Sequence, residues 1–142
     1  MGKKRIKTIQ ADNLKLSKKK LKKKTRTCVE TGRAYIQSGY NNTIITFTDE
    51  KGDILISSSC GTLGFKGAKK ATPYAATLLV KETIEKIRPL GLKKVKVFVK
   101  GVGYARDQAI RALAFNGLDL ISIKDITPMP HGGCRPRKPR RV

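Results

Sequence analysis

The feature of this sequence that most constrains its fold is a change of period across residues 60–73. A strand-like run at residues 53–59 leads into this stretch, and a run of helical period at residues 74–88 leaves it. Thr72 is of a type that commonly caps helix N-termini, and Pro73 is favoured at the first helical position. The pattern therefore predicts a strand, a loop and a helix in immediate succession.

The loop is rich in groups that attract phosphate. It holds three glycines and the cations Lys66, Lys69 and Lys70. Glycine lets a backbone approach a ligand closely, and a helix N-terminus offers free N–H groups and partial positive charge to an anion. We interpret the loop as a phosphate-binding surface. Three alternatives stay open: a flexible connection, a site for a small phosphorylated metabolite, and a nucleotide P-loop, whose Gly-x-x-x-x-Gly-Lys-Ser/Thr spacing is absent.

Strand and helix patterns account for the rest of residues 32–126. Alternating and β-branched residues predict strands at 32–38, 43–48, 53–59, 95–100 and 120–126. The first three, joined by turns, form an antiparallel meander. Apolar stripes predict helices at 73–88 (Ala76, Val80, Ile84, Ile87) and at 105–116 (Ala109, Ile110, Leu113). The order β-β-β-α-β-α-β predicts one α/β domain, a mixed sheet with two main helices in two or three layers.

The charge of the chain is large and unevenly placed. The net charge is +22; residues 1–27 hold 12 basic residues against one acid, and residues 128–142 hold five and none. This divides the chain into a basic extension at 1–27, a globular domain at 28–127 and a Pro/Arg-rich tail at 128–142. Such charge calls for a polyanion, nucleic acid first and an anionic membrane surface second. Without a run of 18 apolar residues, no helix is expected to span a bilayer.

Both basic segments are predicted to stay disordered until a polyanion binds them. The Lys block at 18–24 could instead be a solubilising tail or a targeting presequence, although its Lys bias disfavours targeting, and no secretory signal is expected. The prolines of 128–142 favour an extended chain whose arginines can follow a phosphate backbone or stack on bases. A passive solubilising tail is the alternative.

Residues that could carry other chemistry lack supporting partners. The three cysteines, Cys28, Cys60 and Cys134, are odd in number and form no Cys-x-x-Cys pair. We therefore expect neither a disulfide framework nor a zinc site, and we expect the protein to reside in a reducing compartment. Residues 101–106 imitate a dinucleotide fingerprint, but Arg106 replaces its third glycine. We interpret them as a second phosphate-facing helix start, a plain connection being the alternative. No catalytic constellation is visible, so we predict no enzyme and no cofactor.

Several short motifs carry a resemblance to a known family. They are Asn-Asn-Thr-Ile at 41–44, Gly-Phe-Lys-Gly at 64–67, Lys-Ala-Thr-Pro-Tyr-Ala-Ala at 70–76, Ile-Arg-Ala-Leu at 110–113, Asp-Ile-Thr-Pro-Met-Pro-His at 125–131, Gly-Cys-Arg-Pro at 133–136 and Arg-Arg-Val at 140–142. In this order the motifs resemble the universal small-subunit ribosomal protein family S-eleven, of bacterial or organellar type. Two departures are residues 101–106, which replace a Gly-Pro-Gly-x-Gly-Arg-like run, and Gly132, where many bacterial members have Asn.

The resemblance implies a structural RNA-binding protein of the small-subunit platform. Such proteins contact ribosomal RNA near the peptidyl and exit tRNA sites and the messenger RNA exit path. The implied neighbours are the bacterial small-subunit proteins numbered six, seven, eighteen and twenty-one. The implied location is the small ribosomal subunit in a bacterial cytoplasm, with an organellar ribosome as the alternative. A phosphate-binding enzyme with a Rossmann-like half and an architectural DNA binder are the competing hypotheses.

Carried over to this chain, the resemblance also implies a set of RNA-facing residues, drawn from the turn, the two loops, the second helix and the tail. They are Asn41, Asn42, Gly64, Phe65, Lys66, Gly67, Lys69, Lys70, Thr72, Arg106, Arg111, His131, Gly133, Arg135, Arg137, Lys138, Arg140 and Arg141.

Overall fold

A computed structural model describes residues 29–135 together with 137 and 138. The order of strands and main helices is the predicted one, with two short 3-10 helices added. The elements are β1 (Thr31–Ser38), β2 (Thr43–Asp49), β3 (Ile54–Ser59), η1 (Gly67–Ala71), α1 (Pro73–Ile87), η2 (Arg88–Leu90), β4 (Lys94–Lys100), α2 (Arg106–Phe115) and β5 (Asp119–Asp125).

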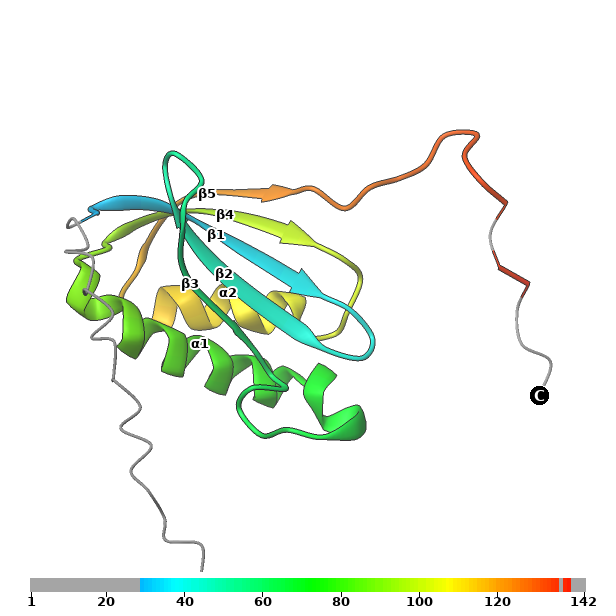
Figure 1. Cartoon of the computed structure of the whole chain (residues 1–142), viewed down its shortest axis with the longest axis horizontal. Helices are drawn as coiled ribbons and strands as arrows, with labels where there is room; N and C mark the ends of the chain where they lie inside the picture. The colour runs from blue at the N-terminus through cyan, green and yellow to red at the C-terminus, as the bar shows by residue number, and fades with distance from the viewer. Residues whose placement is uncertain (1–28, 136, 139–142) are drawn as a thin grey trace, which may run out of the picture.

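The five strands form one mixed sheet in the order β3-β2-β1-β4-β5. β1 pairs antiparallel with β2, and β2 with β3, which confirms the predicted meander. β4 lies parallel to both β1 and β5. Both helices cover the same face of the sheet, so the domain has two layers (Figure 1). The other face carries no helix of the described residues, and we call it the open face.

The hairpin turn after β2 is held by one carboxylate. Oδ1 of Asp49 accepts hydrogen bonds from the backbone N–H groups of Lys51, Gly52 and Asp53, at 2.7, 2.9 and 3.1 Å. Asp and Gly in such positions are typical turn formers, because a short acceptor can satisfy the backbone locally. The predicted turn is confirmed, and it sets the register in which Thr48 pairs with Ile54.

α1 begins where the sequence predicts. Oγ1 of Thr72 accepts a hydrogen bond from the N–H of Ala75 at 3.3 Å, and Pro73 occupies the first turn. The helix ends at Ile87, one residue earlier than expected, and passes into η2. Pro89 explains this end, because it has no N–H with which to continue the helical ladder.

The core fills the space between the helices and the sheet. The predicted stripe of α1 is fully or almost fully buried. On the sheet, the largest fully buried side chains include Phe47, Ile36 and Ile45. In α2 the predicted Ala109 and Leu113 are buried and Ile110 is half-buried against the core. Alternation along the strands therefore places apolar side chains under the helices.

Candidate nucleic-acid interface

Three segments with predicted site residues, and the loop that leads to Arg106, meet at one end of the sheet. β1, β3, β4 and β5 run in the same direction, so their carboxyl ends share an edge. From this edge leave the turn at 39–42, the loop at 60–72, the loop at 101–105 and the chain from residue 126 onward (Figure 1). We call these segments the strand-end rim. Both α1 and α2 also begin there.

The loop at 60–72 presents its lysines on a partly helical backbone. Gly64 and Gly67 adopt φ of 90° and 58°, values that favour glycine. The turn of 3-10 helix η1 follows, which the sequence did not predict. It ends where the N–H and the hydroxyl of Thr72 both donate to the carbonyl oxygen of Lys69, at 3.4 and 2.8 Å. Lys66 and Lys69 are exposed, and the hydroxyl of Thr72 is already used in capping.

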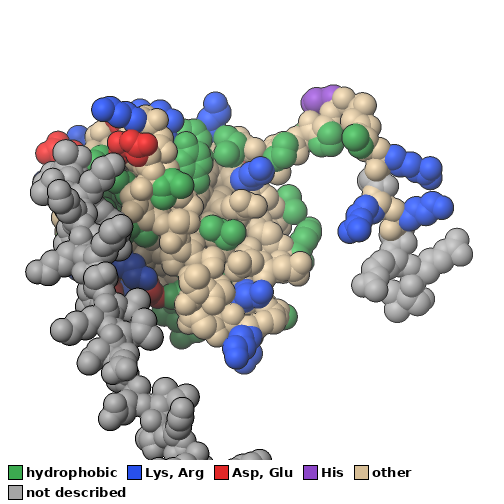
Figure 2. All heavy atoms as spheres, viewed as in Figure 1, with side chains coloured by type: hydrophobic (Ala, Val, Ile, Leu, Met, Phe, Trp, Pro, Cys, Tyr) green, Lys and Arg blue, Asp and Glu red, His purple; other side chains and the backbone are tan. Residues whose placement is uncertain are grey.

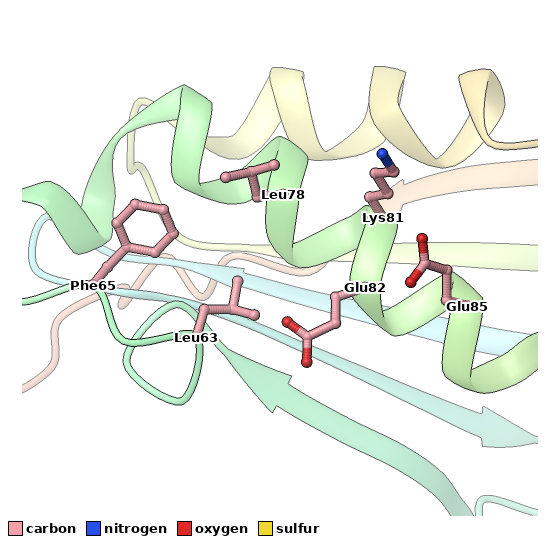
Figure 3. Close-up of a pocket in the computed structure, with 6 residues that line it drawn as sticks. All are labelled: Leu63, Phe65, Leu78, Lys81, Glu82 and Glu85. Atoms are coloured by element: carbon pink, nitrogen blue, oxygen red, sulfur yellow. The ribbon is translucent and has the colours of Figure 1, made fainter.

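Phe65 anchors this loop to α1. Its half-buried ring packs edge-to-face with Tyr74, with the ring centroids 6.4 Å apart. Phe65 and Leu63 also line a shallow groove of about 320 Å³ against α1, completed by Leu78, Lys81, Glu82 and Glu85 (Figure 3). Two carboxylates against one ammonium do not suit a phosphate. The aromatic ring of this motif therefore positions the loop within the protein.

The turn at 39–42 shows an exposed amide and an exposed aromatic ring. Oδ1 of Asn42 accepts the N–H of Thr43 at 3.0 Å, whereas Asn41 is exposed. Tyr40 is 66% exposed and lies edge-on to Tyr104, which is 80% exposed, with a centroid distance of 6.3 Å. Exposed aromatic rings can stack on unpaired bases. Sequence reasoning missed this pair, although each tyrosine adjoins a glycine or asparagine of a turn.

The loop at 101–105 uses its glycines for contact with β1. The N–H of Gly103 donates to the carbonyl oxygen of Ser38 at 3.0 Å. A Cβ at Gly101 would come within 2.2 Å of that oxygen, and one at Gly103 within 2.6 Å of the oxygen of Gly39. Only glycine fits so close to another backbone. These glycines therefore serve internal packing, which argues against a dinucleotide-binding loop.

Arg106 is engaged within the protein. Its guanidinium donates to the carbonyl oxygen of Gly101 at 3.2 Å and to Oδ2 of Asp125 at 2.5 Å. Oδ1 of Asp125 accepts the hydroxyl and the N–H of Thr127 at 2.6 and 2.9 Å. These Thr127 bonds, with help from Arg106, lower the pKa of Asp125 to about 2. The network holds the first residues after β5 against the loop at 101–105.

The remaining predicted residues are spread over α2 and the tail. Arg111 is exposed on α2, about 7.5 Å along the helix from Arg106. His131, Gly133, Arg135, Arg137 and Lys138 are exposed. In Figure 2 the basic side chains of the described tail lie apart from the globular body. Arg140 and Arg141 lie outside the described residues.

Cysteines and acidic residues form no metal-binding cluster in the described part of the chain. There, no three His, Cys, Asp or Glu residues come together as metal ligands would. Cys60 is buried, and burial raises the pKa of its thiol, while Cys134 is exposed. Cys28 lies outside the described residues. None of the helices within residues 29–135 combines the length and apolar character needed to cross a membrane.

A basic α/β domain with lysines, glycines and exposed aromatic rings at one edge is typical of nucleic-acid-binding proteins. Comparison with known proteins narrows this class. The family model for ribosomal protein S11 matches residues 32–141. The chain belongs to the ribosomal protein S11 family and is therefore a ribosomal protein, not an enzyme.

Two relatives illustrate the similarity. Small ribosomal subunit protein uS11 of Borreliella burgdorferi (strain ZS7) is 50% identical over 121 residues, which cover 85% of this chain and 93% of the relative. The protein of the same name from Treponema pallidum (strain Nichols) is 52% identical over 121 residues, covering 85% of this chain and 96% of the relative. The resemblance inferred from the motifs is thereby confirmed.

Proposed function

We propose that this chain is a structural protein of the small ribosomal subunit and binds ribosomal RNA of the platform. The proposed contacts lie near the peptidyl and exit tRNA sites and the messenger RNA exit path. The proposed neighbours are the small-subunit proteins numbered six, seven, eighteen and twenty-one in bacteria. The proposed setting is a bacterial ribosome, with an organellar ribosome as the alternative.

The observation that carries this proposal is the convergence at the strand-end rim. Segments distant in sequence bring exposed Lys66 and Lys69, exposed Asn41 and two exposed tyrosines to one end of a rigid sheet. Lysines supply phosphate contacts, and amides and aromatic rings supply contacts to bases and sugars. Membership of a ribosomal protein family, with relatives named as small-subunit proteins, supports RNA as the polyanion.

The proposed mechanism combines the rigid rim with the basic tail. The tail leaves the domain beside Arg106, whose ion pair with Asp125 supports the direction in which residues 126 and 127 run. Prolines restrict the tail before binding, so its ordering on RNA costs less than that of a flexible lysine tail. Among the predicted contacts, Phe65, Thr72 and Arg106 have internal roles, so we expect them to act by holding the rim in shape.

The rim is tested by changing Lys66, Lys69 and Lys70 together to alanine in the full chain. Affinity for in-vitro-transcribed small-subunit ribosomal RNA should fall on the order of tenfold, and the salt slope should shrink by about 3, because each phosphate contact contributes about one. Thermal stability should change by less than about 0.5 kcal/mol. Lost stability with unchanged RNA binding would make the loop a packing element and contradict the proposal.

The tail is tested by competition with the parent chain for incorporation into small subunits. Truncation after Pro130 should leave the domain folded and impair incorporation. Changing Arg135, Arg137, Arg140 and Arg141 to lysine should recover only part of this loss relative to truncation, because lysine cannot reproduce forked contacts to phosphate. Full incorporation of the lysine variant would show that charge alone matters. Full incorporation of the truncated chain would make the tail a passive solubiliser.

A further inference from the structure

We propose that the open face of the sheet is a second RNA-contact surface, which binds the phosphate backbone and continues the strand-end rim. The inference rests on the proposed function, because it takes RNA as the partner. Its cations are Arg33 from β1, Lys94, Lys96 and Lys100 from β4, and Lys124 from β5. None of them belongs to the predicted site. The helices lie on the opposite face, so nothing in the described chain covers this one (Figure 1).

Strand register brings these cations into one field. On β4, Val95, Val97 and Val99 are buried under the helices, so the alternating lysines point to the open face. Successive open-face positions of β4 are about 6.6 Å apart. Lys94 and Lys96 occupy neighbouring positions, and Phe98 stands between Lys96 and Lys100. Across the strands, Arg33 pairs with Lys96, and Phe98 pairs with Lys124.

The charges on this face lack partners within the described chain. The described ion pairs are Lys86–Glu82 and Arg106–Asp125, and neither includes an open-face cation. The one carboxylate at an open-face position of the described strands is that of Asp119. It stands opposite Lys94 in the register of β4 and β5, at one end of the face. Like charges directly opposite each other on neighbouring strands, such as Arg33 and Lys96, repel. A bound polyanion would remove this repulsion.

An aromatic pair gives the centre of the face its shape. Tyr35 and Phe98 pair across β1 and β4, and their rings stack with centroids 5.1 Å apart and planes inclined by 17°. Both side chains are half-buried. The rings pack on each other and form a ridge that lies between Lys96 and Lys100 along β4 and beside Lys124 of β5. The phenolic O–H of Tyr35 can donate to a phosphate or a ribose 2′-hydroxyl.

Continuity with the rim identifies the occupant as RNA. Lys100 directly precedes Gly101, which begins the rim loop, and Lys124 directly precedes Asp125, which anchors the tail. A phosphate backbone that reaches the rim can therefore continue over the open face and stay close to positively charged side chains along the way. The four lysines are exposed and Arg33 is half-buried, and such long cationic side chains suit sequence-independent contacts with a phosphate backbone. An acidic protein surface is the competing occupant, which the experiment below separates.

The test compares three charge-matched variants of the full chain. The open-face variant carries Lys96→Gln, Lys100→Gln and Lys124→Gln. The control variant carries Lys51→Gln, Lys81→Gln and Arg88→Gln, which removes the same charge from exposed positions on the β2–β3 turn and the helix layer. The rim variant carries Lys66→Gln, Lys69→Gln and Lys70→Gln. Each is titrated with in-vitro-transcribed small-subunit ribosomal RNA across salt concentrations, and the bound RNA is probed by hydroxyl-radical footprinting.

The open-face variant should bind on the order of tenfold more weakly than the control, with a salt slope smaller by about 2–3. It should lose protection at nucleotides that the rim variant still protects. If it matches the control in affinity, slope and footprint while the rim variant is weakened, the inference fails and the proposed function stands. Pulldown of purified neighbouring small-subunit proteins lost only in the open-face variant, with RNA binding intact, would also overturn it. Failure of the parent chain to bind the RNA would refute the proposed function itself.

Discussion

The two faces of the sheet use the same strands for opposite purposes. Along β4, the residues Val95, Val97 and Val99 are buried beneath the helices, while Lys94, Lys96 and Lys100 are exposed on the other side. Along β1, Ala34 and Ile36 are buried, while Arg33 and Tyr35 reach the open face. Because strand side chains alternate with a period of two, one segment can supply both an apolar layer and a cationic layer.

The difference between the faces separates stability from binding. The covered face contributes by removing apolar area from water, so truncation there reduces the free energy of unfolding. The cations of the open face have no ion-pair partner among the described residues, and such solvated charges contribute little to folding. The following changes test this separation, from the largest expected effect to the smallest.

Matched phenylalanines offer the largest contrast. Phe47 is fully buried on the covered face, so Phe47→Ala should lower the free energy of unfolding by about 3–5 kcal/mol. Phe98 is half-buried in its stack with Tyr35, so Phe98→Ala should cost about 1–2 kcal/mol. Urea denaturation of both variants measures the difference. Equal losses would mean that the open face is as much a folding surface as the covered one.

Two positions of β1 sharpen the comparison within one strand. A Cβ at Gly32 would come within 2.6 Å of the carbonyl oxygen of Thr48 and 2.8 Å of Cδ1 of Leu92. Gly32→Ala should therefore destabilise the domain by about 1–3 kcal/mol through overpacking. Gln37→Ala, at an exposed open-face position, should stay within about 0.5 kcal/mol. Thermal melts measure the stability of both variants. A larger loss of stability in Gln37→Ala than in Gly32→Ala would contradict the separation of the two faces.

The third test concerns the cap of the helix that covers the sheet. Thr72→Ala removes the acceptor for the N–H of Ala75 and should cost about 1 kcal/mol. Thr72→Ser keeps a hydroxyl and should restore most of that stability. Any loss of RNA affinity should follow stability across both variants. If Thr72→Ser is stable but binds RNA poorly, the threonine methyl group contacts RNA directly.

The smallest expected effect is a pH dependence at the start of the tail. The pKa of Asp125 falls from 3.8 to about 2 in the folded chain. A lowered folded-state pKa means that its stabilising contribution is complete above the ordinary value and is lost as pH falls through about 2. Asp125→Asn should therefore lose less stability than the parent over this range. Parallel acid titrations of the two proteins, followed by circular dichroism, would contradict this if their curves had the same steepness.

Local patterns predicted most of the fold. Strand alternation, the stripe of α1 and the cap at Thr72 depend on nearby residues, and the structure bears them out within one or two residues. Local patterns could not decide between two and three layers, because the number of layers depends on the order of the strands in the sheet. Once β4 lies beside β1 and β5 beside β4, right-handed crossovers in one direction place both helices on one face.

The arrangement of the candidate site could be predicted from the sequence only in part. The exposed lysines of the loop at 60–72 could be expected from composition alone. The engagement of Arg106 could not, because its partner Asp125 lies on another element and reaches it only through the pairing of β4 with β5. The contact of Tyr40 with Tyr104 likewise depends on the loop at 101–105 resting on the end of β1.

The central place of β1 has a consequence for synthesis. As the chain emerges, β1 can pair at once with β2, but its other neighbour is β4, with Thr31 opposite Lys94. Until β4 has been made, one edge of β1 has unpaired backbone groups, and the sheet lacks α2, which follows β4 in the chain. Open edges and distant pairings are slow to form and prone to aggregation. The nascent protein is therefore prone to aggregation until the second half of the domain has left the exit tunnel of the ribosome that synthesises it.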